Sequence, residues 1–361
     1  MNKKVKYSLF FSLLLIVTAV NAQIKEVGPM LSGSTADAQQ LFSAYLKPYA
    51  NAFGADLNGG WYNTAKNHKL LGVDLTFSIS TAFVPSSDKT YNVNDLHLTG
   101  NPTITGGPLA PTVAGSDPSP KLTYMVSGKK IAEFNTPSGT GVGTIPTPMI
   151  QLGIGLVKET DIVGRFFPKV DLGNNGSIQM WGIGIKHSLK QYIPGIKMAP
   201  FFHLSFFGGY TQLKTRVGLN FQPSFFEDPT GVNAAPGTLD LDYSNQMMQL
   251  TFNSFTANII ASFDLPVVTF YGGAGFSSTS TKLSLTGNYP MAGLKGGVIT
   301  VDDQFALNNP INIKMKSKDG SATKPRLNGG IKFKFAIITL HFDYTYANYS
   351  VFTGGLGLSI R

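Results

Sequence analysis

His341 and Asp343 come closest, in type and spacing, to a catalytic pair in this sequence. They lie two positions apart, so on a β-strand both side chains point to the same face. A carboxylate beside an imidazole can orient the ring for proton transfer. A nucleophile would have to come from another strand, and no spacing identifies one. We therefore expect that the protein is not an enzyme, with a lipid hydrolase as the weakest alternative.

Metal and cofactor chemistry find no support in the sequence. The five histidines show no ligand spacing for zinc, and the chain has no cysteine, which excludes disulfides and thiolate chemistry. Gly139, Gly141 and Gly143 lie among Ser, Thr and Pro and do not lead from a strand into a helix, so they do not form a phosphate-binding loop. The sequence predicts no metal and no cofactor.

Basic side chains form a second group of candidates. They occupy the polar side of alternating segments, opposite apolar residues, and comprise Arg165, Lys169, Lys186, Lys332 and Lys334. If these polar faces line a lumen, its excess positive charge could hold the carboxylate or sulfate of an amphipathic ligand, and His341 and Asp343 would share that site. The alternative is that a wet lumen tolerates any polar residue at these positions.

The elements that must position these residues are β-strands. Apolar residues take the odd positions from Ile331 to Phe335 and the even positions from Ile338 to Tyr346, on either side of a turn at Ala336. Successive strand side chains face opposite sides, so each segment has one apolar and one polar face. The same pattern runs from Leu71 to Val84 and recurs through most of the chain.

Composition decides which kind of β-protein this is. Charged residues make up 14% of the chain, against about 25% in soluble domains, and there are 40 glycines and 14 tyrosines. A secreted β-sandwich would also alternate, but its strands average about 5 to 6 residues, whereas a bilayer crossing needs about 9 to 11. We predict an all-β fold: an antiparallel transmembrane β-barrel of about 10 to 14 strands with an N-terminal plug helix and long extracellular loops.

Connections between the strands alternate in length. Short turns fall at Lys158, Pro194, Leu265 and Ala336, whereas the long, Pro-, Gly- and Ser-bearing segments are 85–146, 218–245 and 287–324. Short periplasmic turns and long external loops are typical of bacterial barrels. The apolar phase slips near residues 253–255, which predicts a β-bulge there.

One helix is predicted in the mature chain. Ser34 or Thr35 can cap it, and Pro48 should kink or end it. Its apolar residues recur at helical spacing and include Leu41, Phe42, Tyr45 and Tyr49. A helix just before the first strand can plug the lumen or lie under the barrel.

The N-terminus indicates export. Lysines precede a short apolar run that ends in small residues at Val20 and Ala22, so residues 1–22 are predicted to be a signal peptide. Residues 23–58 then carry the plug helix, and residues 59–361 form the barrel. The mature chain has 26 Lys and Arg against 20 Asp and Glu, and this diffuse charge of +6 does not favour nucleic acid. We expect a monomer in the bacterial outer membrane, with membrane lipid as its partner.

A family resemblance rests on three stretches. They are LNGGWYNTAKNHKLLGVDLTFSIS (57–80), PTPMIQLGIGLVKETDIVGRFFPKV (146–170) and TLHFDYTYANYSVFTGGLGLSIR (339–361). The chain resembles an uncharacterised family of bacterial outer-membrane barrels and is distantly similar to FadL-type transporters of hydrophobic compounds. The second resemblance implies a 14-stranded barrel with residues 36–58 as a hatch. The chain departs from the usual terminal aromatic residue and ends in Ile360 and Arg361.

The sequence thus favours a barrel that admits small hydrophobic or amphipathic molecules by passive diffusion through a plugged lumen. A structural or secretion-associated barrel that binds a partner through its external loops is the main alternative.

Overall fold

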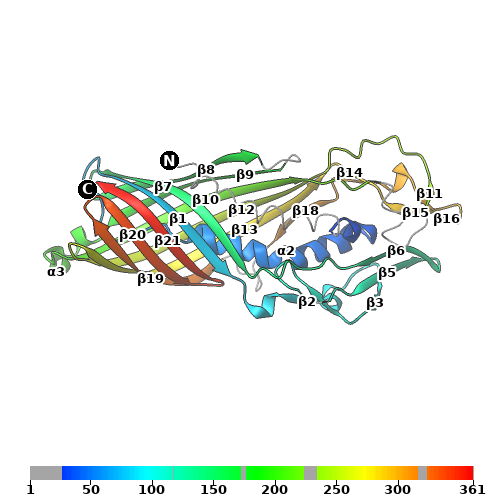
Figure 1. The fold of residues 1–361 in the computed structure, drawn as a ribbon, viewed down its shortest axis with the longest axis horizontal. Coiled ribbons are helices and arrows are strands. Elements are labelled where there is room, and N and C mark those ends of the chain that lie inside the picture. Colours follow the sequence, from blue (N-terminus) through cyan, green and yellow to red (C-terminus); the bar gives the residue numbers. More distant parts are fainter. Residues whose placement is uncertain (1–26, 117, 172–175, 223–233, 316–322, 361) are drawn as a thin grey trace.

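Ten antiparallel strands close into a barrel in the computed structural model (Figure 1), which describes residues 27–116, 118–171, 176–222, 234–315 and 323–360. The predicted signal peptide, residues 1–22, lies outside the described residues. The barrel strands are β1 (Val73–Phe83), β7 (Thr144–Leu156), β8 (Thr160–Asp171), β9 (Ser177–Ser188), β10 (Phe202–Gly218), β12 (Met247–Asp264), β13 (Val268–Thr286), β19 (Thr323–Phe335), β20 (Ile338–Tyr346) and β21 (Ser350–Ile360).

Barrel strands that follow one another in the sequence are hydrogen-bonded neighbours in the barrel wall. The barrel strands from β7 to β21 pair in chain order, and β1 closes the barrel between β21 and β7. All four predicted short turns lie at one end, here called the turn end, where Val73 pairs with Ile360. The long connections lie at the other end, the loop end, which corresponds to the external side of bacterial barrels. Ten strands agree with the predicted range and are fewer than the 14 of FadL-type proteins.

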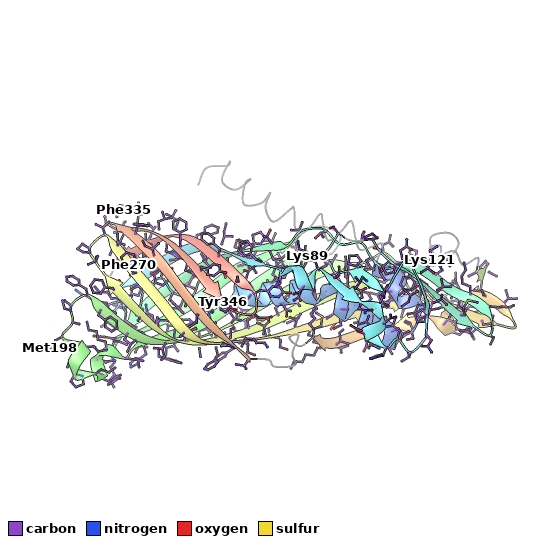
Figure 2. All side chains as sticks on the ribbon, turned by 90° about the horizontal axis from the view of Figure 1, so that it is seen from below. Lys89, Lys121, Met198, Phe270, Phe335 and Tyr346 are labelled. Atoms are coloured by element: carbon purple, nitrogen blue, oxygen red, sulfur yellow. The ribbon has the colours of Figure 1, made fainter. Side chains whose placement is uncertain are left out.

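The barrel wall has an apolar outer face and a polar inner face, as the alternation predicted. Outward side chains are largely exposed, and they include Leu75, Ile79, Leu152, Ile183, Ile185, Ile259, Phe270, Leu356 and Leu358. Figure 2 shows Phe270, Phe335 and Tyr346 on the outer surface of the strands. Burial of such a belt in hydrocarbon removes it from water, whereas the hydrogen bonds of a closed sheet satisfy the backbone.

Helix α2 (Thr35–Asn58) runs along the inside of the barrel from the loop end (Figure 1). Ser34 caps it as predicted, since its Oγ accepts from the Asp37 amide at 3.0 Å. Pro48 does not end the helix, which continues for ten further residues to Asn58. No helix in the described part of the chain has both the length and the apolarity of a helical membrane span.

Beyond the membrane belt the long connections fold into what we call the external head. It contains η1 (Gly28–Ser32), η2 (Ser86–Asp88), β2 (Thr90–Asn92), η3 (Val93–Leu96), β3 (Thr103–Thr105), β4 (Leu109–Pro111), β5 (Lys121–Val126), β6 (Lys129–Asn135), β11 (Ala235–Pro236), β14 (Asn288–Tyr289), β15 (Ala292–Lys295), β16 (Val298–Val301), η6 (Asp303–Phe305), β17 (Leu307–Asn308) and β18 (Ile311–Met315). Lys89 and Lys121 mark the head in Figure 2, and Met198 marks the opposite end, beside η4 (Lys190–Tyr192) and α3 (Pro194–Lys197).

The first half of α2 is the centre of the head. Leu41, Phe42 and Tyr45 are at most 1% exposed, and they belong to one apolar core that also contains Leu122, Phe134, Leu213, Phe252, Leu283 and Tyr289. Tyr49 packs partly buried against the same core. The four residues predicted for the plug helix therefore fix α2 in the head, and the lumen is filled by residues further along.

The predicted bulge near residues 253–255 is wrong. Strand β12 pairs one to one with β10 and with β13 through this segment. Phe252 points inward and is 1% exposed, whereas Phe255 points outward and is 52% exposed. The apolar phase changes because the inner face of β12 passes from the polar lumen to the apolar core of the head. Met248, Leu250 and Phe252 contact this core, whereas the alternate positions Gln249, Thr251 and Asn253 are polar.

Candidate functional site

The lumen is occupied by the chain itself. We call residues 54–68 the plug: they comprise the last turn of α2 and the linker that leads from it toward β1. Plug residues contact inward-facing side chains around the barrel, such as Thr147 on β7, which donates to Asp56 at 2.8 Å, and Thr279 on β13, which accepts from Asn58 at 3.1 Å. Polar lumen positions are therefore buried although they lie inside a barrel.

Two arginines hold the C-terminal end of α2. Arg165 on β8 donates to the carbonyl oxygens of Leu57, at 3.0 Å, and Gly59, at 2.6 Å. Arg326 on β19 donates to the carbonyl oxygen of Asn58. The last carbonyls of a helix lack intrahelical partners and carry the negative end of its dipole, so cations are stabilising there. These two guanidinium groups cap the plug helix.

Arg165 also orders the start of the linker. Its guanidinium lies 3.7 Å from the centre of the Trp61 ring, and its Nε donates to the Gln151 amide oxygen at 3.1 Å. Gln151 donates in turn to the backbone oxygen of Trp61. Trp61 and Tyr62 both pack on Phe207 of β10, with ring centroids 5.3 and 5.6 Å away.

The middle of the linker is bound from strands β19 and β10. Tyr62 donates to Asn328 on β19 at 2.6 Å, and Lys332 donates to the Asn63 side chain at 2.8 Å. On the other side, Ser205 of β10 donates to the carbonyl of Ala65 at 2.6 Å. Ser205, like Gln151 and Arg165, thus satisfies a carbonyl of an irregular backbone segment that water would otherwise solvate.

A buried ionic cluster fastens the end of the plug near the turn end. Asp161 on β8 accepts from Lys186 on β9 at 2.9 Å, and its carboxylate also contacts the ring Nδ1 and the backbone amide of His68, both at 3.0 Å. Lys186 donates in addition to the carbonyl of Lys66. We call His68, Asp161 and Lys186 the latch. Gly155 lies beside it, where an added Cβ would meet the carbonyl oxygen of Lys69 at 2.1 Å.

The residues predicted to bind a ligand lie in different environments. Arg165, Lys186 and Lys332 do point into the lumen, but they bind the plug. Lys334 is half-buried close to the turn end. The inward orientation predicted for Lys169 is wrong: the pairing of β8 and β9 shifts between Phe167 and Val170, and Lys169 is exposed in an ion pair with Asp171.

His341 and Asp343 lie inward on β20 and are almost completely buried. Asp343 accepts from the Tyr271 hydroxyl at 3.2 Å, and no hydrogen bond joins it to His341 in the described structure. Within the described ranges, no three His, Asp or Glu side chains form a metal site. The orienting hydrogen bond considered for this pair is thus not formed between the two side chains in the described structure.

Arg326, Asp161 and Asn328 are functional candidates that the sequence analysis did not single out. The alternation that places Lys332 inward also places Arg326 and Asn328 inward, six and four positions earlier on the same strand. The alternation of the strand could therefore have identified Arg326 and Asn328 as inward-facing residues. Asp161 lies four positions before Arg165 and shares its inward parity, but its contacts with His68 and Lys186 have no signal in the sequence.

A cleft and a cavity border α2 at the loop end. The larger is an open cleft of about 690 Å³ between the helix, the 87–96 segment and β18, lined by both polar and apolar side chains. The smaller is a cavity of about 50 Å³ between the helix and strands β13, β19 and β20. Lys47 lines both.

The chain belongs to a family of unknown function, DUF6588, whose model matches residues 1–360. No curated protein sequence matches it. Among solved structures it is similar to the translocator domain of the autotransporter NalP from Neisseria meningitidis, with a TM-score of 0.31 and 9% identity over 82% of this chain and 89% of that one.

Two further structures are similar at the same level. The toluene transporter TodX of P. putida has a TM-score of 0.24 and 8% identity over 80% of this chain and 90% of TodX. Ail of Yersinia pestis has a TM-score of 0.26 and 9% identity over 81% of this chain and 99% of Ail. The pairing of the ten strands itself defines the architecture.

Proposed function

We propose that the protein is a monomeric, gated outer-membrane barrel, which admits small amphipathic molecules by passive diffusion once the plug moves. The observation that carries this proposal is the way the lumen is filled. Its plug is held by hydrogen bonds from wall side chains to backbone carbonyls, at Leu57, Gly59, Ala65 and Lys66. Such bonds exchange with water at a net cost of about 1 kcal/mol each, so a hydrated lumen can release the plug.

The open cleft supplies an entry site on the external side. Its polar lining includes Gln39, Gln40 and Asn92, and its apolar lining includes Leu96 and Ile313. A molecule with a polar head and an apolar body fits this mixture. One wall of the cleft is α2, so a molecule bound there touches the element whose end fills the lumen, and binding can shift the population of docked plug.

The resemblance to FadL-type transporters supports a hydrophobic cargo, and the predicted signal peptide supports an outer-membrane location. We propose no bond-making step, because His341 and Asp343 serve the packing of the lumen wall.

The test uses 1-N-phenylnaphthylamine, a small hydrophobic dye that becomes fluorescent inside the cell envelope, in a strain whose outer membrane excludes it. Expression of the protein should speed dye entry, and the large polar antibiotic vancomycin should gain no access. A variant with the plug locked by a disulfide should not speed dye entry. Equal dye entry with locked and unlocked protein would refute the gating proposal.

A further inference from the structure

A row of lysines crosses four neighbouring strands at the loop end of the wall. Lys214 on β10 pairs with Thr251 on β12, which pairs in turn with Lys282 on β13. Lys282 also pairs with Lys314 on β18. Side chains of directly paired residues lie on the same face of a sheet, so the three basic side chains share one face. We call Lys214, Lys282 and Lys314 the lysine row.

The lysine row faces outward. The neighbouring residues Leu213, Leu283 and Met315 are at most 5% exposed and belong to the apolar core of the head. Successive strand side chains point to opposite faces, so the lysines next to them lie on the outer face. Lys282 and Lys314 are exposed, and Lys214 is half-buried.

The row lies just beyond the aromatic edge of the apolar belt. Trp181 on β9 and Tyr210 on β10 pack together on the outer face, with ring centroids 5.5 Å apart, and the Tyr210 hydroxyl donates to Asn253 at 2.8 Å. Outward Trp and Tyr side chains typically mark the level where hydrocarbon meets lipid head groups. Lys214 follows Tyr210 by four residues on the same strand, toward the loop end. The lysine row therefore lies on the head-group side of this edge.

The outer face of the wall does not neutralise the row. Beyond Trp181 and Tyr210, the outward positions of β9, β10, β12, β13 and β18 hold no Asp or Glu. Among the residues that the structure describes, no member of the row forms an ion pair. Lys282 and Lys314 stand directly opposite each other, and like charges in such a cross-strand pair are destabilising. An anion beside them would relieve this repulsion.

We propose that the lysine row binds the phosphate groups of lipid head groups in the external leaflet. Ammonium groups form charge-assisted hydrogen bonds with phosphate oxygens, and basic residues next to a membrane attract anionic lipids. Lys214 and Lys282 are two strand spacings apart, about 10 Å, so a head group with two phosphates can contact both. The proposal depends on the loop end being external and is independent of the gate.

Lipid titration followed by native mass spectrometry tests the proposal on the full mature protein in uncharged detergent. The probes are diphosphoryl lipid A, monophosphoryl lipid A and sodium phosphate. We expect diphosphoryl lipid A to bind about fivefold more tightly than the monophosphoryl form, because loss of one phosphate removes the contact of about one lysine. Equal binding of the two lipids would overturn the proposal. Sodium phosphate that binds as tightly as diphosphoryl lipid A would indicate a site for soluble anions, and would also overturn it.

Paired variants locate the binding on the row. Lys282→Gln with Lys314→Gln should weaken the binding of diphosphoryl lipid A about 25-fold, a factor of about five for each lysine near a lipid surface. Lys158→Gln with Lys197→Gln removes two exposed lysines at the turn end, and this matched control should leave the affinity unchanged. Heat-modifiable migration in gels confirms that each barrel is folded. Unchanged affinity in the first pair, or an equal loss in both pairs, would contradict the proposal, whatever the dye-entry experiment shows.

Discussion

The guanidinium carbon of Arg165 lies over the Trp61 ring, 3.7 Å from its centre, while the guanidinium donates to the carbonyls on either side of Asn58. One wall residue thus joins the end of the plug helix to the start of its linker. Loss of this residue should therefore release both parts of the plug at once.

Arg165→Met keeps the volume of the side chain and removes its donors. Two buried carbonyls lose their partner, so the docked plug should be destabilised by about 3 kcal/mol, which raises the undocked fraction about a hundredfold. Ion conductance of single barrels in planar bilayers measures this. Arg216→Met is the control, because Arg216 is exposed at the loop end of β10 and donates to Gln249. Equal conductance in the two variants would remove Arg165 from the gate.

Asp161→Asn should open the latch. The amide leaves Lys186 buried without its carboxylate and weakens the contacts to His68, and a buried unpaired charge is strongly destabilising. The chain has no cysteine, so Asn67→Cys reports on the linker by maleimide labelling. We expect labelling to become about tenfold faster in the Asp161 variant.

The matched change for the latch experiment is Asp171→Asn, which breaks an exposed ion pair on the same strand. An exposed pair contributes little to stability, so labelling of residue 67 should stay slow. Fast labelling in both variants would show that the linker is released by any loss of charge on β8.

Acid should loosen one sheet of the external head. The hydrogen bond from Lys295 holds the pKa of Asp302 below its usual value, so the ionised carboxylate stabilises the fold above about pH 4 and this contribution is lost as the pH falls through the lower folded value. Protection of residues 292–305 against hydrogen exchange, measured relative to the intrinsic rate at each pH, should therefore fall as the pH is lowered below about 4, and Asp302→Asn should reduce this dependence. A rate that follows only intrinsic exchange in the native protein would contradict it.

Alternation predicted the barrel because a bilayer imposes a period of two on every strand that crosses it. The same rule misled at Phe252, where the inner face leaves the polar lumen and enters the apolar core of the head. The orientation predicted for Lys169 was wrong for a local reason. The pairing of β8 with β9 shifts after Phe167, and the alternation of inward and outward side chains does not continue across this shift. The hydropathy pattern of a strand reflects its surroundings, but it does not show where the inner face passes from the polar lumen to an apolar core.

The basic lumen residues were found, but their partners were not. Arg165, Lys186 and Lys332 bind the plug mostly through backbone carbonyls or an amide, and a backbone carbonyl has the same form in every residue. Nothing in the sequence therefore marks residues 57–68 as the ligand of these cations. Only the three-dimensional structure, in which the linker lies inside the barrel, shows what the positive charge in the lumen binds.

Closure of the lumen by the end of α2 and its linker is the central feature of the proposed gate. Cysteines at Gly54 and Thr279 can lock them, because a Cβ added at Gly54 lies 2.8 Å from that of Thr279, and a shift of about 1 Å reaches disulfide geometry. In the Arg165→Met background, oxidation of Gly54→Cys with Thr279→Cys should abolish single-channel conductance, and a reductant should restore it. Conductance that persists in the oxidised protein would show that ions pass by another route and that the plug is no gate.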